Sequence, residues 1–198
     1  MHEADDDAQA DSGFYLAGER VEDARVSTGL YVYTTSSDVL DSVAVGDSIS
    51  LSGTVQEYRS SSKPDYLFLT ELASPSDIEV LSSNNTVTPV ILGYDRSPPT
   101  QKLSSLDVGD DGWLSVPNNQ TRIEDINPTL VPSVYGLDFW ESLEGQLVLI
   151  SSPTALNFEN SYGEFWAYGN WTVTGKNGRG GLSLNFGMPP STRCLLRC

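Results

Sequence analysis

Histidine is almost absent from this sequence: His2 is the only one among 198 residues. Histidine is the side chain that most often moves protons at neutral pH, and it is the base in Ser-His-Asp and Cys-His sites. His2 lies in an acidic stretch, residues 1–12, that we expect to be a disordered tail. None of those sites can therefore be built here, and we predict no catalytic residue in this chain.

Positive charge is also scarce. The chain has 11 Lys and Arg against 27 Asp and Glu, which gives a formal net charge of −16. A surface this acidic repels phosphate backbones and anionic lipids. The composition therefore disfavours a protein that coats nucleic acid and fits a secreted protein that its acidity keeps soluble.

Cysteines and long hydrophobic runs are the other shortages. Cys194 and Cys198 lie at the very end of the chain, so no disulfide crosses its body. A Cys-x-x-x-Cys pair without a nearby histidine is a poor zinc site, and we predict no metal site. No run approaches the ~18 apolar residues that a membrane span needs, so we expect no membrane partner.

Three Asn-x-Ser/Thr triplets point to the secretory route. They begin at Asn84, Asn119 and Asn170, and we predict N-glycosylation at each. The polar start of the chain shows no signal peptide, so we expect the sequence to be a piece of a longer secreted protein.

Short strands with tight turns dominate the first half. Gly (17) and Pro (11) favour this organisation over long helices. The predicted strands are 13–16, 27–33, 47–58, 65–72 and 77–81. In the third, apolar and polar residues alternate, and Gly53 on the apolar face permits a bend or bulge. Five strands with a long, bent third strand predict a small OB-like β-barrel over residues 13–82.

A polar linker, residues 83–88, leads to a second β-rich domain at 89–187. Its predicted elements are strands at 89–93, 146–151, 164–168, 171–174 and 181–186, one short helix at 137–143, and a turn at 176–181. Residues 188–198 keep none of this pattern and are expected to be disordered. The predicted fold class is mainly β: a small OB-like barrel followed by a second β-rich region with one short helix.

Several short motifs occur in a characteristic order. They are GFYL at 13–16, GLYVY at 29–33, VGD at 45–47, GTVQEY at 53–58, TEL at 70–72, WESLEGQLV at 140–148 and YGE at 162–164. In this order they resemble the N-terminal, non-catalytic region of secreted nucleases of the endonuclease/exonuclease/phosphatase (DNase I-like) superfamily. The resemblance covers roughly residues 13–186.

The resemblance implies a function for the chain. In that superfamily a separate C-terminal domain hydrolyses nucleic acid with a divalent metal such as Mg²⁺, a metal-binding Glu and two histidines. The resemblance implies that such a domain lies outside this chain, which itself needs no cofactor. It implies a secreted accessory region that guides nucleic acid to the catalytic domain.

The barrel's aromatic residues and the nearby cations are the predicted contacts. OB barrels stack bases or sugars on their second and third strands. The predicted contact residues are Phe14, Tyr31, Tyr33, Tyr58, Arg59, Lys63, Lys176 and Arg179. Packing within the barrel wall is the alternative for the aromatics, and a polar hairpin is the alternative for 176–181.

Two functions stay open. The first is a nuclease accessory region with weak, salt-sensitive DNA binding. The second is a structural or carbohydrate-binding extracellular β module with no nucleic-acid role. Paired carboxylates could also hydrolyse glycosides, with candidates such as Glu141 and Glu144, although solvation at the surface is what we expect of them. The oligomeric state is not predicted.

Overall fold

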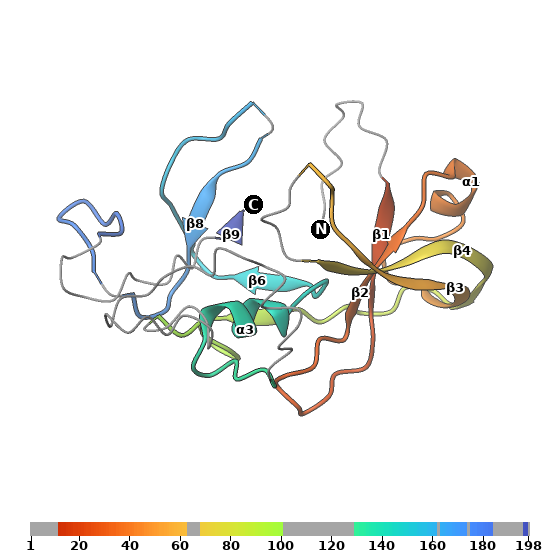
Figure 1. The fold of residues 1–198 in the computed structure, drawn as a ribbon, viewed down its shortest axis with the longest axis horizontal. Coiled ribbons are helices and arrows are strands. Elements are labelled where there is room, and N and C mark those ends of the chain that lie inside the picture. The colour runs from red at the N-terminus through yellow and green to blue at the C-terminus, as the bar shows by residue number, and fades with distance from the viewer. Residues whose placement is uncertain are drawn as a thin grey trace.

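A computed structural model describes residues 12–62, 68–100, 129–161, 163–173 and 175–183, and the backbone of Leu196 and Arg197. Two groups of strands lie side by side along the long axis of the molecule, the N-terminal sheet on the right of Figure 1 and the C-terminal group on the left. The fold is mainly β, as predicted, and the helices in the described ranges are short.

Four strands form the N-terminal sheet. They are β1 (Gly13–Ala17), β2 (Gly29–Tyr33), β3 (Ser48–Tyr58) and β4 (Leu69–Ser82), in the order β1-β2-β4-β3. β2 and β4 run parallel, and the other two pairs are antiparallel. Because β1 and β3 each pair on one side only in the described part, this sheet is open, and closure into a barrel is not confirmed. A four-residue helix, α1 (Ser37–Leu40), which the sequence did not indicate, lies between β2 and β3.

β4 differs from the prediction because the strands expected at 65–72 and 77–81 are one strand of 14 residues. β4 pairs with β3 along its length despite two kinds of irregularity. Ser74 and Asp77 of β4 have positive φ, and the register of the pairing shifts between Ser50 and Thr54 of β3. Gly53 sits at these shifts, where an added Cβ would lie 2.6 Å from the Leu72 side chain. A bulge with a glycine thus keeps the ladder intact, and the predicted role of Gly53 is confirmed.

The C-terminal group contains short strands and one helix. Its elements are β5 (Val90–Leu92), α3 (Gly136–Glu141), β6 (Val148–Ile150), β7 (Thr154–Ala155), β8 (Trp166–Tyr168) and β9 (Leu196–Arg197). β5 and β6 pair in parallel, and β7-β8-β9 form an antiparallel sheet. The strands expected at 89–93, 146–151 and 164–168 and the helix at 137–143 are confirmed with shorter or shifted bounds.

Three details of this group depart from the prediction. Residues 171–173 lie outside any strand. Of the strand expected at 181–186, the described residues form one bridge, between Lys176 and Leu182. β9 falls inside the tail expected to be disordered, and it pairs with β8.

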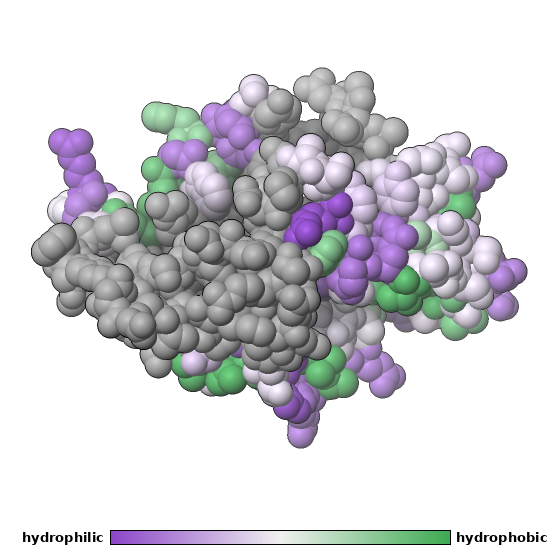
Figure 2. All heavy atoms as spheres, in the orientation of Figure 1, coloured by the Kyte–Doolittle hydropathy of each residue, from purple (hydrophilic) through white to green (hydrophobic). Residues whose placement is uncertain are grey.

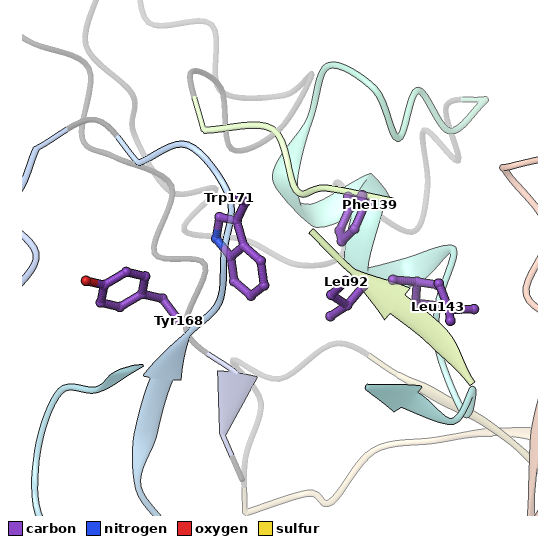
Figure 3. Packing of buried hydrophobic residues seen from close by; sticks show 6 residues of the cluster. Leu92, Phe139, Leu143, Tyr168 and Trp171 are labelled. Carbon is purple, nitrogen blue, oxygen red and sulfur yellow. The ribbon is translucent and has the colours of Figure 1, made fainter. Parts of the chain in front are cut away.

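A hydrophobic cluster joins α3, β5 and β8. Phe139 and Leu143 come from α3 and the turn after it, Leu92 from β5, and Tyr168 and Trp171 from β8 and the residues that follow it. In Figure 3, Trp171 lies between Tyr168 on one side and Leu92 and Phe139 on the other. All five are buried. Burial of a side chain of this size stabilises a fold by roughly 1.5–3 kcal/mol, so this cluster holds α3 against β5 and β8.

The turn after α3 is where the two groups of strands meet, and we call this contact the seam. Gly29 of β2 lies against Gly145, so that an added Cβ on Gly29 would be 2.2 Å from the Gly145 carbonyl carbon. The Ser27 hydroxyl donates a hydrogen bond to the Glu144 carbonyl. The N–H of Thr70 donates to the Glu144 carboxylate at 3.3 Å. Two facing glycines therefore allow the backbones to approach closely.

Replacement of Gly29 by alanine tests this seam. The added methyl group would collide with the Gly145 backbone, so we expect the free energy of unfolding to fall by about 1–3 kcal/mol. Gly178→Ala is the matched control, because nothing lies within 4 Å of a Cβ there. Urea unfolding should show little change for Gly178→Ala, and equal stability of the two variants would contradict the seam.

Candidate functional site

A row of polar and aromatic side chains crosses the N-terminal sheet. Residues directly opposite each other in a ladder share a face, so the pairings place Tyr15, Tyr31, Glu71 and Gln56 in one row across β1, β2, β4 and β3. The rings of Tyr15 and Tyr31 are in contact, with centroids 4.9 Å apart. Gln56 Nε2 donates a hydrogen bond of 2.5 Å to Glu71 Oε1. Each side chain of the row thus has a neighbour from the adjacent strand.

Strand alternation adds two more tyrosines to the same face. Tyr33 lies two residues after Tyr31, and Tyr58 lies two residues after Gln56. Tyr33 is 42% exposed and Tyr58 is 50% exposed. We call the side of the sheet made by this set the tyrosine face: Tyr15, Tyr31, Tyr33, Gln56, Tyr58 and Glu71. Glu71 is buried beneath its neighbours.

Tyr31 is held in place on this face. Its hydroxyl donates a hydrogen bond of 2.8 Å to the Ser12 carbonyl. Its ring passes Gly13, where an added Cβ would lie 2.7 Å from ring atoms. Tyr15 beside it is 61% exposed. Burial of part of the side chain, and then the nearby Tyr31 and Glu144, raise the pKa of Tyr15, so its hydroxyl remains a hydrogen-bond donor at neutral pH.

Carboxylates from both groups of strands gather at the seam. Thr70 contacts two of them, since its N–H donates to Glu144 and its hydroxyl donates to Glu57 at 2.9 Å. Burial, followed by the negative charges of Glu144, Glu57 and Asp138, raises the pKa of Glu141 to about 7. Burial also raises the pKa of Glu144. The combined charge gives this end of the sheet a negative potential, which repels phosphate and accepts hydrogen bonds from hydroxyl groups.

The predicted aromatic contacts divide between the two faces of the sheet. Tyr31, Tyr33 and Tyr58 lie together on the tyrosine face. Phe14 alternates with Tyr15 and pairs with Val32, which is fully buried. The structure therefore places Phe14 on the opposite face.

The predicted cations are spread over the molecule. Arg59 follows Tyr58 and lies over the ring of Phe68, 4.3 Å from its centroid. Lys63 lies outside the described residues. Lys176 lies over the ring of Tyr168 in the C-terminal group, and Arg179 lies in the neighbouring exposed turn. Arg59 is thus the described member of the predicted set that adjoins the tyrosine face.

The turn at 176–181 forms a polar hairpin. The Asn177 side-chain oxygen accepts hydrogen bonds from the N–H groups of Arg179, at 2.9 Å, and Gly181, at 3.1 Å. These backbone donors are therefore satisfied within the turn. The segment thus has the structure of the polar hairpin that was the alternative to a contact site at 176–181.

Two of the three predicted glycosylation sites lie in the described part. Asn84 and Asn170 are both exposed, and Asn84 follows β4 in the left-handed conformation, with φ of 60°. Asn119 lies outside the described residues. The two described sites are accessible from solvent.

Tyr15, Gln56 and Glu71 were not among the contact residues predicted from the sequence. Alternation within β1 and β3 could have placed Tyr15 and Gln56 on a polar face. Glu71 could not be found in this way, because its place between Tyr31 and Gln56 depends on the pairing of β4 with two other strands.

In the described part of the chain, no helix is long and apolar enough to cross a membrane, and no group of three or more His, Cys, Asp or Glu could hold a metal ion. On the face in Figure 2, hydrophobic residues form small patches between hydrophilic ones. The tyrosine face is therefore the candidate site that the geometry defines best.

Comparison with known proteins gives a family match to the C-terminal group. A family model described as "Domain of unknown function (DUF8508)" matches residues 91–196, more than half of the 198 residues. The matched residues include α3, β6, β8 and the seam glycine Gly145. No curated protein and no solved structure matches the chain.

The raised pKa of Glu141 predicts a pH dependence of stability. Between the ordinary value of 4.5 and about 7, the folded state binds more protons than the unfolded state, so stability falls as the pH rises through this range. Because the side chain is only partly buried, we expect a loss of about 1–2 kcal/mol between pH 5 and pH 8. Glu141→Gln should remove this pH-dependent loss of stability, because glutamine does not titrate.

Urea unfolding at pH 5 and pH 8 measures the effect. Glu159→Gln serves as the control, because Glu159 is exposed on the loop between β7 and β8. If Glu141→Gln keeps the pH dependence of the unsubstituted chain, the carboxylate cluster does not act on stability as described.

Proposed function

The chain belongs to the family described as a domain of unknown function (DUF8508), and within it we propose a non-catalytic, extracellular accessory β module whose tyrosine face binds an uncharged carbohydrate. The observation that carries this proposal is the contacting pair Tyr15–Tyr31 next to the hydrogen-bonded pair Gln56–Glu71.

The chemistry of these side chains suits a sugar. A tyrosine ring offers a flat apolar surface for the C–H face of a pyranose, and its hydroxyl offers a polar end. Gln56 is exposed and supplies an amide for hydrogen bonds with sugar hydroxyls, while the buried carboxylate of Glu71 accepts from Gln56 and orients that amide. Tyr15 and Tyr33 are exposed, so a ligand can reach them without rearrangement of the strands. The surface combines stacking and hydrogen bonding in one row.

The charges around this face favour an uncharged ligand over DNA. Glu57 and Glu144 border it through Thr70, and the net charge of the chain is −16. Affinity for nucleic acid comes largely from lysine and arginine at phosphates. Lys176 and Arg179 lie in the other group of strands, where they cannot assist Arg59.

Guidance of nucleic acid for a nuclease is the second candidate function. The order of motifs along the chain and the position of Arg59 beside Tyr58 favour it. In that case the hydrolytic chemistry would belong to a further domain with a divalent metal such as Mg²⁺, and this chain would supply stacking contacts alone.

An extracellular location agrees with the positions of the glycosylation triplets. Asn84 and Asn170 are exposed. Asn84 comes after the C-terminal end of β4, whereas Glu71 of the tyrosine face lies near the start of that strand. Glycans at these positions add bulk at the surface of the molecule.

Ligand class is tested by calorimetry with neutral glucan, mannan and xylan oligosaccharides, and by fluorescence anisotropy with single-stranded and duplex DNA at low and physiological salt. We expect saturable binding of one of the oligosaccharides and no binding of DNA. Tyr15→Ala should weaken sugar binding at least fivefold, if a sugar ring gains from stacking about the 1–3 kcal/mol that a base gains on an aromatic ring. Tyr94→Ala is the control, because Tyr94 is 85% exposed and lies outside the N-terminal sheet.

Each other outcome has a definite meaning. Salt-sensitive DNA binding that Arg59→Ala removes would replace the carbohydrate proposal with the nuclease accessory function. Binding of neither ligand would overturn both and leave a structural module.

Secretion with a leader sequence from a eukaryotic cell tests the glycosylation sites. Digestion with an N-glycosidase should lower the mass of the secreted chain, and Asn84→Gln and Asn170→Gln should each remove one glycan. Asn85→Gln is the control, because it keeps the Asn84 triplet intact. A secreted chain without glycan at either position would contradict this part of the proposal.

A further inference from the structure

A cavity lies at the seam, between the loop that joins β1 to β2 and the C-terminal group. Its volume is about 470 Å³, within the range of small-molecule sites. Two arginines line it, Arg20 from the loop and Arg96 from the residues after β5. Its apolar wall includes Val21, Val26 and Val90. Glu22 and Asp23 line it as well, and Asp23 is paired with Arg25. The cavity thus has an apolar part and a charged part that contains both arginines.

Arg96 is fixed at this place by neutral partners. Its Nη2 donates hydrogen bonds to the Ala24 carbonyl at 3.1 Å and to the Ser142 hydroxyl at 2.7 Å. Its guanidinium also lies 5.0 Å from the centroid of the Phe139 ring. These contacts orient the guanidinium but bring no negative charge. Arg96 therefore forms no ion pair with the described residues that hold it.

Arg20 adds a second positive charge to the same cavity. In the described part of the chain, neither Arg20 nor Arg96 forms an ion pair, whereas Asp23 is held by Arg25 at 2.6 Å. Burial, and then the charge of Arg20, lower the pKa of Arg96. Two close cations of like charge repel each other, and an anion placed between them would remove that repulsion.

We propose that this cavity binds a small organic carboxylate, with Arg20 and Arg96 at the carboxylate group and the valines around a short apolar chain. Arg20 makes no hydrogen bond to another described residue, so its N–H groups are available for a bidentate contact. Glu22 also lines the cavity, and its charge favours a monoanion over a dianion such as phosphate or sulfate. The proposal does not rest on the tyrosine face.

Calorimetric titration of the whole chain with isobutyrate in low-salt buffer tests the site. Isobutyramide, a neutral molecule of nearly the same shape, is the ligand control, and sulfate is the dianion control. We expect saturable binding of isobutyrate together with a raised melting temperature, no binding of isobutyramide, and weaker binding of sulfate. Arg20→Gln should weaken isobutyrate binding at least tenfold without a change in fold, because Arg20 is exposed and supports no other residue.

Variants distinguish the site from general charge effects. Arg179→Gln removes an equal charge from the distant hairpin and should leave isobutyrate binding unchanged. Arg96→Gln should also abolish binding, and its melting temperature without ligand shows whether the seam survives. The proposal is overturned if isobutyrate does not bind, if isobutyramide or sulfate binds as well as isobutyrate, or if Arg20→Gln behaves like Arg179→Gln. Tyr15→Ala should bind isobutyrate normally, which separates this test from that of the tyrosine face.

Discussion

The close approach of the backbones at Gly29 and Gly145 is the contact on which the other features of this molecule depend. It brings the turn after α3 against β2, so that Glu144 reaches the N–H of Thr70 and Ser27 reaches the Glu144 carbonyl. On the same seam, Arg96 joins the β1–β2 loop to Ser142. Neither the border of the tyrosine face nor the arginine cavity would exist if the two groups of strands were apart.

The seam also divides the charge of the molecule. Carboxylates from α3 and β3 meet beside the tyrosine face, where burial and mutual repulsion raise the pKa of Glu141. Two arginines meet in the cavity, where their partners are neutral groups. A chain with a net charge of −16 thus holds a cluster of carboxylates and a pair of arginines at one contact.

The family match separates these two surfaces along the chain. Residues 91–196 include α3, Arg96 and most of the hydrophobic cluster, whereas the tyrosine face lies at residues that precede them. Arg20 of the cavity also precedes the matched segment. Each proposed site therefore uses residues of the N-terminal sheet or its loops. The matched segment supplies Glu144 beside the tyrosine face and Arg96 in the cavity.

Local patterns in the sequence were sufficient for the mainly β fold. Period-2 alternation in β3, a glycine at its bulge and the helical spacing at 137–143 each involve neighbours in sequence. The structure confirms the strand, the bulge and the helix, although burial alternates only in the first part of β3 and Val55 is 65% exposed. The scarcity of histidine and lysine likewise limited the chemistry without any coordinates. Tertiary structure alone decided that β4 is continuous, that Glu71 lies between Tyr31 and Gln56, and that Phe14 faces away. It also decided that Arg20 and Arg96 share a cavity. The physical reason is that alternation follows from the geometry of one strand, whereas strand partners and cavities follow from burial between segments far apart in the chain.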